Sequence, residues 1–337
     1  MKKFRWCVVG AGGIADRRAI PAIMKEENFA LAAIMDRTPA VAERLGEKYG
    51  VKAYTDEETM LKETPCDGVY IATPVALHYP QATAALKYGC NVLVEKPLGM
   101  NRRECDRLVA AFRRENKLLD AGYMMKYHNL HVKAKNLLRG GKIGQVNTVR
   151  FFFSCWYPEI EGAWRQQRAL GGGGSVMDLG AHCIELAEYL LGEEIAETKS
   201  FLANRTFSYE TEDTGVFLFR TKSGVIGSAE ASFNVPDGCE SRLEIYGTEG
   251  CVVCRGTLGQ EEKGSLSYLR APSAGYDAMQ NRFKPKAKKY YGAGGDLYLK
   301  QFRDFAARAA RGKNDLLSAE RAAQVQGVID GIYAEKR

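Results

Sequence analysis

Asp178 and His182 are the two residues whose types and spacing point most directly to chemistry. They lie four positions apart, just after the four consecutive glycines 171–174. This spacing on a helix places both side chains on one face. An imidazole titrates near neutral pH and can take and return the proton of a hydroxyl group, and a carboxylate beside it can orient the ring or bind a substrate hydroxyl. The pair is therefore a candidate site for proton transfer to or from an alcohol.

Both residues also have a structural interpretation. Ser175 and Asp178 have the spacing of a helix capping box. A single histidine often does no more than bind a backbone carbonyl in a core. The glycine run favours a functional interpretation, because backbone without side chains is entropically costly unless another group has to approach it closely.

Glu95, Lys96 and Pro97 form a second candidate site. They follow the apolar segment 91–94, which has the character of a buried strand. The carboxyl ends of strands line the ligand crevice of a doubly wound sheet. The Lys96 ammonium could hydrogen-bond a substrate oxygen there and stabilise developing negative charge, with Glu95 as a counter-charge. Taken alone, the triplet is equally compatible with an ordinary surface lysine at a strand end.

A glycine-rich turn near the start of the chain has the spacing of a dinucleotide site. Residues 10–15 read GAGGIA and follow the apolar segment 4–9. The first glycine of this G-x-G-x-x-A pattern permits a tight turn, the second lets the backbone approach a pyrophosphate, and the small last residue lets the helix pack on the strand. The phosphates then lie on unpaired N–H groups at the start of the helix.

Asp36 ends the next apolar segment and is the candidate ribose-binding residue. It stands 24 positions after Gly12. An acidic side chain at this place accepts hydrogen bonds from the adenosine ribose hydroxyls and repels a 2′-phosphate, which favours NAD over NADP. Arg37 leaves NADP open, because an adjacent guanidinium could hold a 2′-phosphate.

Strands and helices are predicted to alternate over the first 120 residues. The predicted strands are 4–9, 31–35, 68–72 and 91–94, and the predicted helices are 14–25, 39–49, 80–88 and 102–115. Alternation of this kind indicates βαβ units and a doubly wound parallel sheet. We therefore expect a dinucleotide-binding domain of the Rossmann type over residues 1–122.

The pattern changes after Tyr123. The predicted elements there are a helix over 130–139, a strand over 145–153, a helix over 175–191, strands over 214–220, 225–233 and 242–246, and helices over 296–311 and 318–334. Residues 259–294 have the least regular pattern. We expect a second α/β domain over residues 123–337 with a large, mostly antiparallel open sheet. The last helices could pack back on the first domain.

Composition excludes several classes of protein. The 337 residues suggest two domains, and 45% hydrophobic with 26% charged residues is ordinary globular usage. The longest uncharged apolar run near the middle, residues 68–77, is too short to span a membrane, and the N-terminal segment lacks the pattern of a signal peptide. Nine scattered cysteines favour reduced thiols in the cytoplasm. A net charge of +7 does not require nucleic acid as a partner.

Several segments together resemble the Gfo/Idh/MocA family, the oxidoreductases related to glucose–fructose oxidoreductase and inositol dehydrogenase. The matching segments are VVGAGGIA (8–15), IATP with LH (71–78), NVLVEKPL (91–98), GYMMKYHN (122–129), KIGQV (142–146), GGGGSVMDLGAHCIELAEYLLG (171–192) and EIYGTEG (244–250). The resemblance covers nearly the whole chain. It implies hydride transfer between a nicotinamide and a hydroxyl or keto carbon of a sugar, an inositol or a related polyol, and a homodimer or homotetramer.

The resemblance implies roles for individual residues. Lys96 matches the family lysine that touches both nicotinamide and substrate, and His182 takes the proton-transfer role beside Asp178. The implied catalytic residues are thus Lys96, Asp178 and His182. The implied cofactor-binding residues are Gly10, Gly12, Gly13, Ile14, Asp36, Arg37, Thr73, Pro74, His78, Glu95 and Lys96, with His78 interpreted as structural. The implied substrate-binding residues are Lys96, Lys126, Trp164, Arg165, Asp178 and His182.

The chain also departs from the family pattern. Val75 stands where an asparagine is frequent, and Lys126 where arginine is usual. A lysine is a point charge and not a fork, so a bidentate carboxylate contact is in doubt. Cys251 and Cys254 lack a second pair for zinc, and no metal is expected. His131 is expected at the surface.

Two other functions remain open at the level of sequence. Bound NAD could assist the cleavage of a glycoside with no net redox change, which would give activity without accumulation of NADH. The chain could also be a non-catalytic dinucleotide sensor, because some relatives regulate transcription. The joint presence of Lys96, Asp178 and His182 disfavours the sensor.

Overall fold

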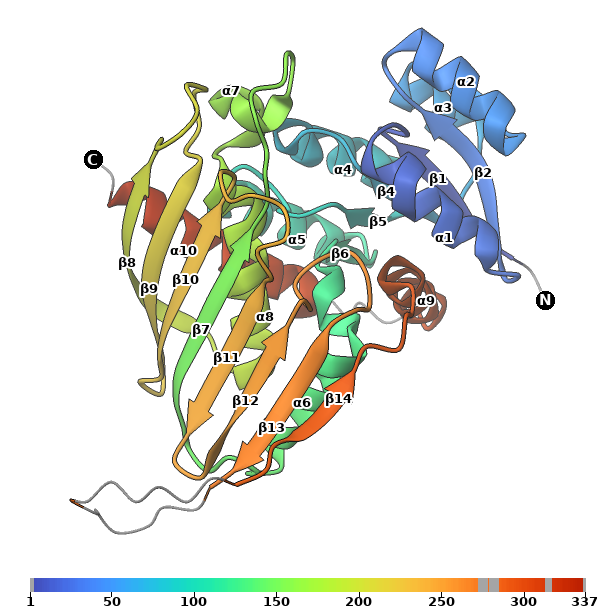
Figure 1. Cartoon of the computed structure of the whole chain (residues 1–337). Helices are drawn as coiled ribbons and strands as arrows, with labels where there is room; N and C mark the ends of the chain where they lie inside the picture. Colours follow the sequence, from blue (N-terminus) through green and yellow to red (C-terminus); the bar gives the residue numbers. More distant parts are fainter. Residues whose placement is uncertain (1–2, 272–277, 279–284, 313–316, 336–337) are drawn as a thin grey trace. The chain divides into compact units, whose positions relative to one another are not determined.

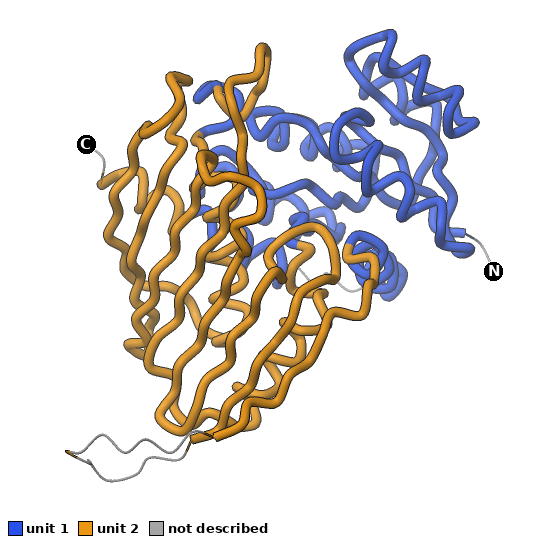
Figure 2. Tube along the Cα trace, viewed as in Figure 1, with its two compact units in different colours: residues 1–123, 167–172, 298–327 blue, residues 124–166, 173–297, 328–337 orange. Residues whose placement is uncertain are grey.

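Two compact units make up the chain (Figure 2). The computed structural model describes residues 3–271, 278, 285–312 and 317–335. The first unit gathers residues 1–123, 167–172 and 298–327, and the second gathers residues 124–166, 173–297 and 328–337. The chain therefore passes between the units several times.

A parallel sheet of six described strands forms the centre of the first unit (Figure 1). The strand order is β3-β2-β1-β4-β5-β6, with β1 (Phe4–Val9), β2 (Phe29–Met35), β3 (Lys52–Tyr54), β4 (Gly68–Ile71), β5 (Asn91–Val94) and β6 (Leu119–Ala121). Each described neighbouring pair is parallel. This is the doubly wound order whose direction reverses between β1 and β4, and the carboxyl ends of the strands at that point are the usual ligand crevice. The predicted parallel sheet is confirmed.

Helices from both ends of the chain complete the first unit. They are α1 (Ile20–Lys25), α2 (Pro39–Tyr49), α3 (Glu57–Glu63), α4 (His78–Lys87), α5 (Arg102–Arg114), α7 (Arg168–Gly171), α9 (Leu297–Ala310) and the first part of α10 (Leu317–Ala334). The Trp6 ring of β1 meets the Phe302 and Phe305 rings of α9 at 4.8 and 5.3 Å between centroids. Phe302 also meets Tyr70 of β4 at 5.2 Å. A helix from late in the chain therefore supplies aromatic side chains to the core of the dinucleotide-binding unit.

The second unit is built on a sheet of eight described strands. Their order is β14-β13-β12-β11-β7-β10-β9-β8, with β7 (Val146–Ser154), β8 (Ile195–Ala203), β9 (Thr214–Thr221), β10 (Ile226–Ser232), β11 (Arg242–Gly247), β12 (Gly250–Arg255), β13 (Ser265–Arg270) and β14 (Lys288–Tyr291). Among these strands β7 and β10 pair parallel, and the other neighbours pair antiparallel. The predicted large, mostly antiparallel sheet is confirmed.

One face of this second sheet is covered and the other is open. Helices α6 (Asn129–Arg139) and α8 (Ala181–Leu191) lie against the covered face (Figure 1). Along β9, Phe217 and Phe219 are buried while Val216 and Leu218, which alternate with them, are exposed. This alternation is the expected result of a strand with one face in a core and one face toward solvent.

The structure corrects several expectations from the sequence. Strand β3, helix α3 and strand β6 were not predicted, and the segment 259–294 contains β13 and β14. The short strands offer too few residues for a periodic pattern. The expectation that His131 lies at the surface is wrong: the side chain is fully buried, with Nδ1 at 2.9 Å from the Met125 carbonyl and Nε2 at 2.9 Å from the Thr257 hydroxyl. No helix in the described part of the chain combines the length and apolarity that a membrane crossing requires.

Candidate active site

The glycine turn after β1 is shaped by direct contact with the end of β4. Gly10 has φ +77°, and a Cβ on it would lie 2.7 Å from Cγ2 of Thr73 and 3.0 Å from the Ala72 carbonyl carbon. The Gly10 and Ala11 amides donate to the Met35 carbonyl at 2.9 and 3.0 Å. Gly13 has φ +57° and open space where a Cβ would stand. Only glycine satisfies both the backbone angle and the close approach at position 10.

The helix after this turn starts with a π-helical turn over Ala15–Ala19, preceded by Ile14, before α1 continues. Its first N–H groups and the bare backbone of Gly12 and Gly13 form a side-chain-free surface at the carboxyl end of β1. Backbone of this kind at a helix start fits a pyrophosphate, because no side chain of the two glycines stands in its way and the helix start favours negative charge. The turn therefore fits a dinucleotide on its own geometry.

Asp36 is held in place by the turn that it was predicted to serve. Its Oδ2 accepts a hydrogen bond from the Gly12 amide at 3.1 Å, and its Oδ1 accepts one from the Thr38 amide at 3.0 Å. A Cβ on Gly12 would lie 3.3 Å from the same carboxylate. Asp36 is half-buried and Arg37 beside it is exposed. The carboxylate is thus fixed at the end of β2, while the guanidinium stands in solvent.

His78 connects the turn after β4 to the turn after β5. Its side chain is fully buried, with Nε2 at 2.9 Å from the Thr73 carbonyl and Nδ1 at 2.8 Å from the Pro97 carbonyl. Burial lowers the pKa of the imidazole to about 4, so the ring is neutral at pH 7. Thr73 also donates its hydroxyl to Gln81 at 2.5 Å. His78 therefore orders the backbone around Pro74 and Lys96, in agreement with its structural interpretation.

Glu95 is a buried carboxylate that fixes the backbone beside Lys96. Its Oε1 accepts the Tyr70 hydroxyl at 2.5 Å, and its Oε2 accepts the Lys96 amide at 3.2 Å. Burial, and then the charge of Glu95, raise the pKa of Tyr70 well above its usual value, so this hydroxyl remains a donor. Gly122 has to be small here, since a Cβ on it would lie 3.1 Å from the Glu95 carboxyl group. The Lys96 side chain itself is half-buried.

In the second unit, Asp178 and His182 lie on consecutive turns at the start of one helical segment. Val176–Gly180 forms a π-helical turn that contains Asp178, and α8 follows with His182 in its first turn. π-helical turns occur frequently at functional sites. His182 is 5% exposed, and its ring lies 6.2 Å from the Phe153 ring of β7. The expected single helix over 175–191 therefore begins with this wider turn.

A buried carboxylate from a distant strand start holds this helix start. Glu212, which is fully buried, accepts hydrogen bonds at Oε1 from the Gly174 amide at 3.0 Å, the Val176 amide at 3.1 Å and the Tyr333 hydroxyl at 2.6 Å. The Met177 amide donates to the Tyr333 oxygen at 3.2 Å. Within the described chain the Ser175 side chain makes no capping bond. Glu212 and Tyr333 take the place of the predicted capping box.

The same two residues explain the glycine run. A Cβ on Gly173 would overlap the Tyr333 hydroxyl, and a Cβ on Gly174 would overlap the Glu212 carbonyl oxygen. The close approach that the sequence suggested is therefore made at these two positions by the chain itself. The run requires glycine for packing, and it carries no separate evidence for a substrate.

Arg165 is the charged partner of Asp178. Its Nε lies 3.3 Å from Oδ2 of Asp178, and its guanidinium carbon lies 4.2 Å from the centre of the Trp164 ring. Burial acts to lower the pKa of Arg165, but the charge of Asp178 and the Tyr157 hydroxyl outweigh this effect, so the pKa is raised overall. The Arg165 carbonyl accepts the Thr211 hydroxyl at 2.9 Å, which fixes the segment to the strand start that supplies Glu212. Asp178, Arg165 and Trp164 thus form one connected group.

The predicted residues form connected groups inside each unit. In the first unit, direct contacts link Gly12 to Asp36, Gly10 to Thr73, and Thr73 through His78 to the residue after Lys96. In the second unit, Trp164, Arg165 and Asp178 are linked, and His182 follows on the same helical segment. The Lys126 ammonium lies over the ring of its neighbour Tyr127, 5.4 Å from the centre.

Sequence reasoning missed Glu212, Tyr333 and Tyr70. Each acts through a neighbour that is far away in the sequence, so no local pattern marks it. The acidic cluster Glu210, Glu212 and Asp213 just before a predicted strand was an available signal for Glu212. Among the described residues no group of three or more His, Cys, Asp or Glu side chains could hold a metal ion.

Two family models match the chain. The model described as the oxidoreductase family with an NAD-binding Rossmann fold matches residues 4–123. The model described as the GFO/IDH/MocA C-terminal domain matches residues 131–253.

Known relatives and a solved structure extend the likeness over most of the chain. A dTDP-3,4-didehydro-2,6-dideoxy-alpha-D-glucose 3-reductase of Streptomyces antibioticus is 31% identical over 248 residues, which are 74% of this chain and 74% of that protein. The scyllo-inositol 2-dehydrogenase (NAD(+)) of Bacillus subtilis is 24% identical over 322 residues, 93% of this chain and 88% of that protein. The crystal structure of a 3-ketoreductase from Actinomadura kijaniata in complex with NADP and TDP-benzene has a TM-score of 0.87 at 25% identity and covers 99% of this chain and 98% of that chain.

Replacement of Gly173 by alanine tests the contact that holds the helix start. The backbone at Gly173 has no positive φ, so the added methyl acts through its overlap with the Tyr333 hydroxyl. We expect Gly173→Ala to lower the free energy of unfolding by about 1–3 kcal/mol. In the double variant with Tyr333→Leu, the cost should be smaller than the sum of the single costs by about 1 kcal/mol or more. Urea denaturation of the four proteins measures this coupling.

Gly259→Ala is the matched control, because a Cβ there meets nothing within 4 Å. Its effect should stay within about 0.5 kcal/mol. If the changes in unfolding free energy caused by Gly173→Ala and Tyr333→Leu were strictly additive, the methyl group and the tyrosine would not compete for the same space.

Proposed function

The chain belongs to the Gfo/Idh/MocA family of NAD(P)-binding oxidoreductases, and we propose that it transfers hydride between the nicotinamide and a hydroxyl or keto carbon of a sugar, an inositol or a related polyol. One observation carries this proposal: a glycine turn that binds Asp36 occurs in the same chain as a helix start that bears both Asp178 and His182. The relatives support the substrate class, since their names describe reduction of a deoxysugar and oxidation of scyllo-inositol.

The bound dinucleotide supplies the hydride donor or acceptor at its nicotinamide C4, and the chain supplies binding and proton handling. We assign the pyrophosphate to the bare backbone of Gly10, Gly12 and Gly13 and the start of the following helix. We assign the adenosine ribose to Asp36, which is fixed in position by the Gly12 and Thr38 amides. Thr73 and Pro74 border the same edge of the sheet, where His78 orders their backbone.

Lys96 and His182 carry the proton and charge steps in this proposal. In the direction of oxidation, His182 takes the hydroxyl proton while the Lys96 ammonium donates a hydrogen bond to the same oxygen and stabilises its developing negative charge. In reduction, His182 returns the proton to the carbonyl oxygen. Asp178 orients His182 or binds a neighbouring hydroxyl, and its ion pair with Arg165 holds the carboxylate in position for either task.

Trp164, Arg165 and Lys126 are assigned to substrate binding. The Trp164 ring lies against the Arg165 guanidinium, which leaves an aromatic face beside a fixed charge. Such a surface suits the alternating apolar and hydroxyl faces of a polyol. Lys126 offers a single charged contact where an arginine would offer two parallel hydrogen bonds.

We further propose a cytoplasmic homodimer or homotetramer that associates through the open face of the second sheet. All nine cysteines are free thiols, which fits a reducing compartment. Phe201 is 88% exposed and lies opposite Val216 across β8 and β9, and Leu218 and Ile226 extend the apolar surface. An apolar surface of this kind on a sheet with a free edge favours association with a second copy.

Leu218→Glu tests this interface. A charge on the apolar surface should reduce the sedimentation coefficient to that of the monomer, because it would be desolvated in the contact. Met24→Glu on α1 is the control, since Met24 is exposed to the same degree, 54% against 53%, and lies in the other unit. An unchanged oligomer in Leu218→Glu would place the interface elsewhere.

Lys96→Met tests the charge-stabilising role. We expect kcat to fall by about 10²–10³-fold or more, because the donor to the reacting oxygen is lost. The Kd for NADH should change little, since the backbone of the glycine turn and Asp36 are untouched. Lys87→Met, at an exposed position near the end of α4, is the control and should keep full activity. Loss of NADH binding together with turnover would count against the assigned role.

Asp36→Ala tests the cofactor preference. Fluorescence titration with excitation of tryptophan and emission from the nicotinamide gives the Kd of both reduced cofactors. The wild type should bind NADH more tightly than NADPH, and Asp36→Ala should weaken NADH binding by about tenfold, as expected for loss of a hydrogen bond to a charged group. Tighter binding of NADPH by the wild type would show that Arg37 dominates over Asp36.

A further inference from the structure

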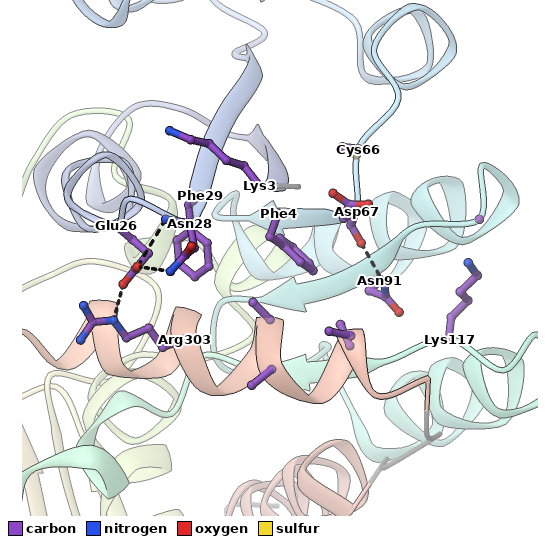
Figure 3. A pocket seen from close by; sticks show the side chains of 15 residues that line it. Lys3, Phe4, Glu26, Asn28, Phe29, Cys66, Asp67, Asn91, Lys117 and Arg303 are labelled. Carbon is purple, nitrogen blue, oxygen red and sulfur yellow. Dashed lines mark hydrogen bonds and ion pairs between the residues drawn. The ribbon is translucent and has the colours of Figure 1, made fainter. Parts of the chain in front are cut away.

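A hollow of about 600 Å³ opens at the edge of the parallel sheet opposite the glycine turn (Figure 3). It lies where β1, β2, β4 and β5 begin, and α9 borders it with alanines. Its charged lining residues are three cations and two carboxylates, Lys3, Lys117 and Arg303 with Glu26 and Asp67. Arg303 pairs with Glu26, as Figure 3 shows. The cofactor role uses the carboxyl ends of these strands, so nothing assigned above occupies this hollow.

Two thiols lie in contact at this edge. Cys66 immediately precedes the last residue before β4, and Cys90 immediately precedes β5, which pairs with β4. Their sulfur atoms are 3.7 Å apart. Cys66 is half-buried and lines the hollow, whereas Cys90 is 4% exposed. A small disulfide that enters the hollow would therefore contact Cys66 first, and Cys90 would lie deeper in the protein, in contact with Cys66.

The backbone around the two thiols is fixed by a shared asparagine. The Asn91 side-chain amide donates to the Asp67 carbonyl at 2.9 Å (Figure 3). The Asn91 side-chain oxygen accepts the Leu118 amide at 2.9 Å. The residues that follow each cysteine are thus tied together. A disulfide bond requires the sulfur atoms to close from 3.7 Å to about 2.05 Å.

We propose that Cys66 and Cys90 are a redox-active thiol pair, and that the hollow admits the small anionic disulfide of a cellular thiol, of the glutathione class, which oxidises them. This proposal does not depend on the hydride-transfer function.

The reaction is a pair of thiol–disulfide exchanges. The Cys66 thiolate attacks one sulfur of the small disulfide, a mixed disulfide forms, and the other half leaves as a thiolate that takes up the proton lost by Cys66. The Cys90 thiolate then attacks Sγ of Cys66 and releases the second half as a thiol. The protein loses two electrons and two protons, and the small disulfide gains both.

The surroundings of the pair set a slow rate at neutral pH. The hydrogen bond with the Cys7 thiol raises the pKa of Cys66 to about 12, with burial and the charge of Asp67 acting in the same direction and the hydrogen bond with Cys90 acting against them. Besides the pair itself, the ionisable groups that act on it include Cys7, Asp67 and Lys117, and the Lys117 charge lowers the pKa of Cys90. Since the thiolate is the reacting form, the rate should rise by about tenfold for each unit of pH below that value. The pair therefore responds to sustained oxidation and not to brief exposure.

Mass spectrometry of the full chain treated with oxidised glutathione tests the proposal. After alkylation and digestion, the wild type should contain a peptide pair linked through Cys66 and Cys90. Cys90→Ser should instead retain glutathione on Cys66, because the second exchange is blocked. Cys239→Ser removes an exposed thiol elsewhere and should leave the linked pair unchanged. Failure to find either the linked peptides in the wild type or the adduct in Cys90→Ser would overturn the proposal.

Two further measurements separate the pair from general thiol oxidation. Oxidation should raise the Tm of the wild type by about 5 °C, reversibly with dithiothreitol, and should leave Cys66→Ser unchanged, because the new bond closes a chain loop between two strands. Because Arg303 is paired with Glu26, Lys3 and Lys117 outnumber Asp67 among the remaining charges of the lining. This small excess of positive charge predicts faster oxidation by oxidised glutathione than by cystamine, which is positively charged, and Lys117→Gln should narrow this difference. Equal rates for both disulfides would show that the hollow does not select the oxidant.

Discussion

At a few glycines the main chain approaches neighbouring groups so closely that no side chain would fit. The candidate residues of both units depend on this constraint. At Gly10 the turn after β1 lies against Thr73 and Ala72, so the phosphate-binding turn and the end of β4 determine each other's position. At Gly173 and Gly174 the start of the helix that carries Asp178 lies against Tyr333 and Glu212. A single methyl group at these positions would separate the elements. The glycines therefore act first on packing, and the positions of the reactive side chains follow from it.

Two buried pairs of tyrosine and glutamate then fix the backbone beside the reactive residues. Tyr70 donates to Glu95, whose other oxygen accepts the Lys96 amide. Tyr333 donates to Glu212, which accepts amides from the start of the Asp178 helix. In both cases a neutral phenol and backbone N–H groups donate to a carboxylate that would otherwise be costly to bury, at both oxygens of Glu95 and at Oε1 of Glu212. Neither glutamate needs to touch a substrate for its loss to disturb the residues that are assigned to do so.

The sequence predicted the helices and strands that have a clear hydrophobic pattern. It did not predict short strands or the burial of side chains whose partners are distant in the sequence. The strands 4–9 and 91–94 and the helix 39–49 agree with β1, β5 and α2 residue for residue, because apolar runs, a proline at the helix start and a glycine at its end mark them. The three-residue strands β3 and β6 carry no such marks. His131 was placed at the surface because the partners that satisfy its ring, Met125 and Thr257, lie 6 and 126 positions away.

The candidate site shows the same division. The residue types at Gly10, Asp36, Lys96, Asp178 and His182 suggested chemistry from local motifs, whereas Arg165 as the partner of Asp178 needed the fold. The glycine run was correctly interpreted as a place of close approach, but the approaching groups belong to the chain itself. Glu212 and Tyr333 meet the helix from positions 36 and 156 residues further along, a relation that no local pattern encodes.

Transfer of deuterium from the C4 position of reduced NAD(P) to a panel of keto-sugars and inosose-type ketones is the direct test of hydride transfer by this chain. Mass spectrometry should find the label on the carbinol carbon of at least one product, in proportion to the cofactor oxidised. Lys96→Met should form the labelled product at least about 10²-fold more slowly. Cofactor binding without label transfer to any ketone, or cleavage of a glycoside with the label returned to the cofactor, would contradict hydride transfer as the function.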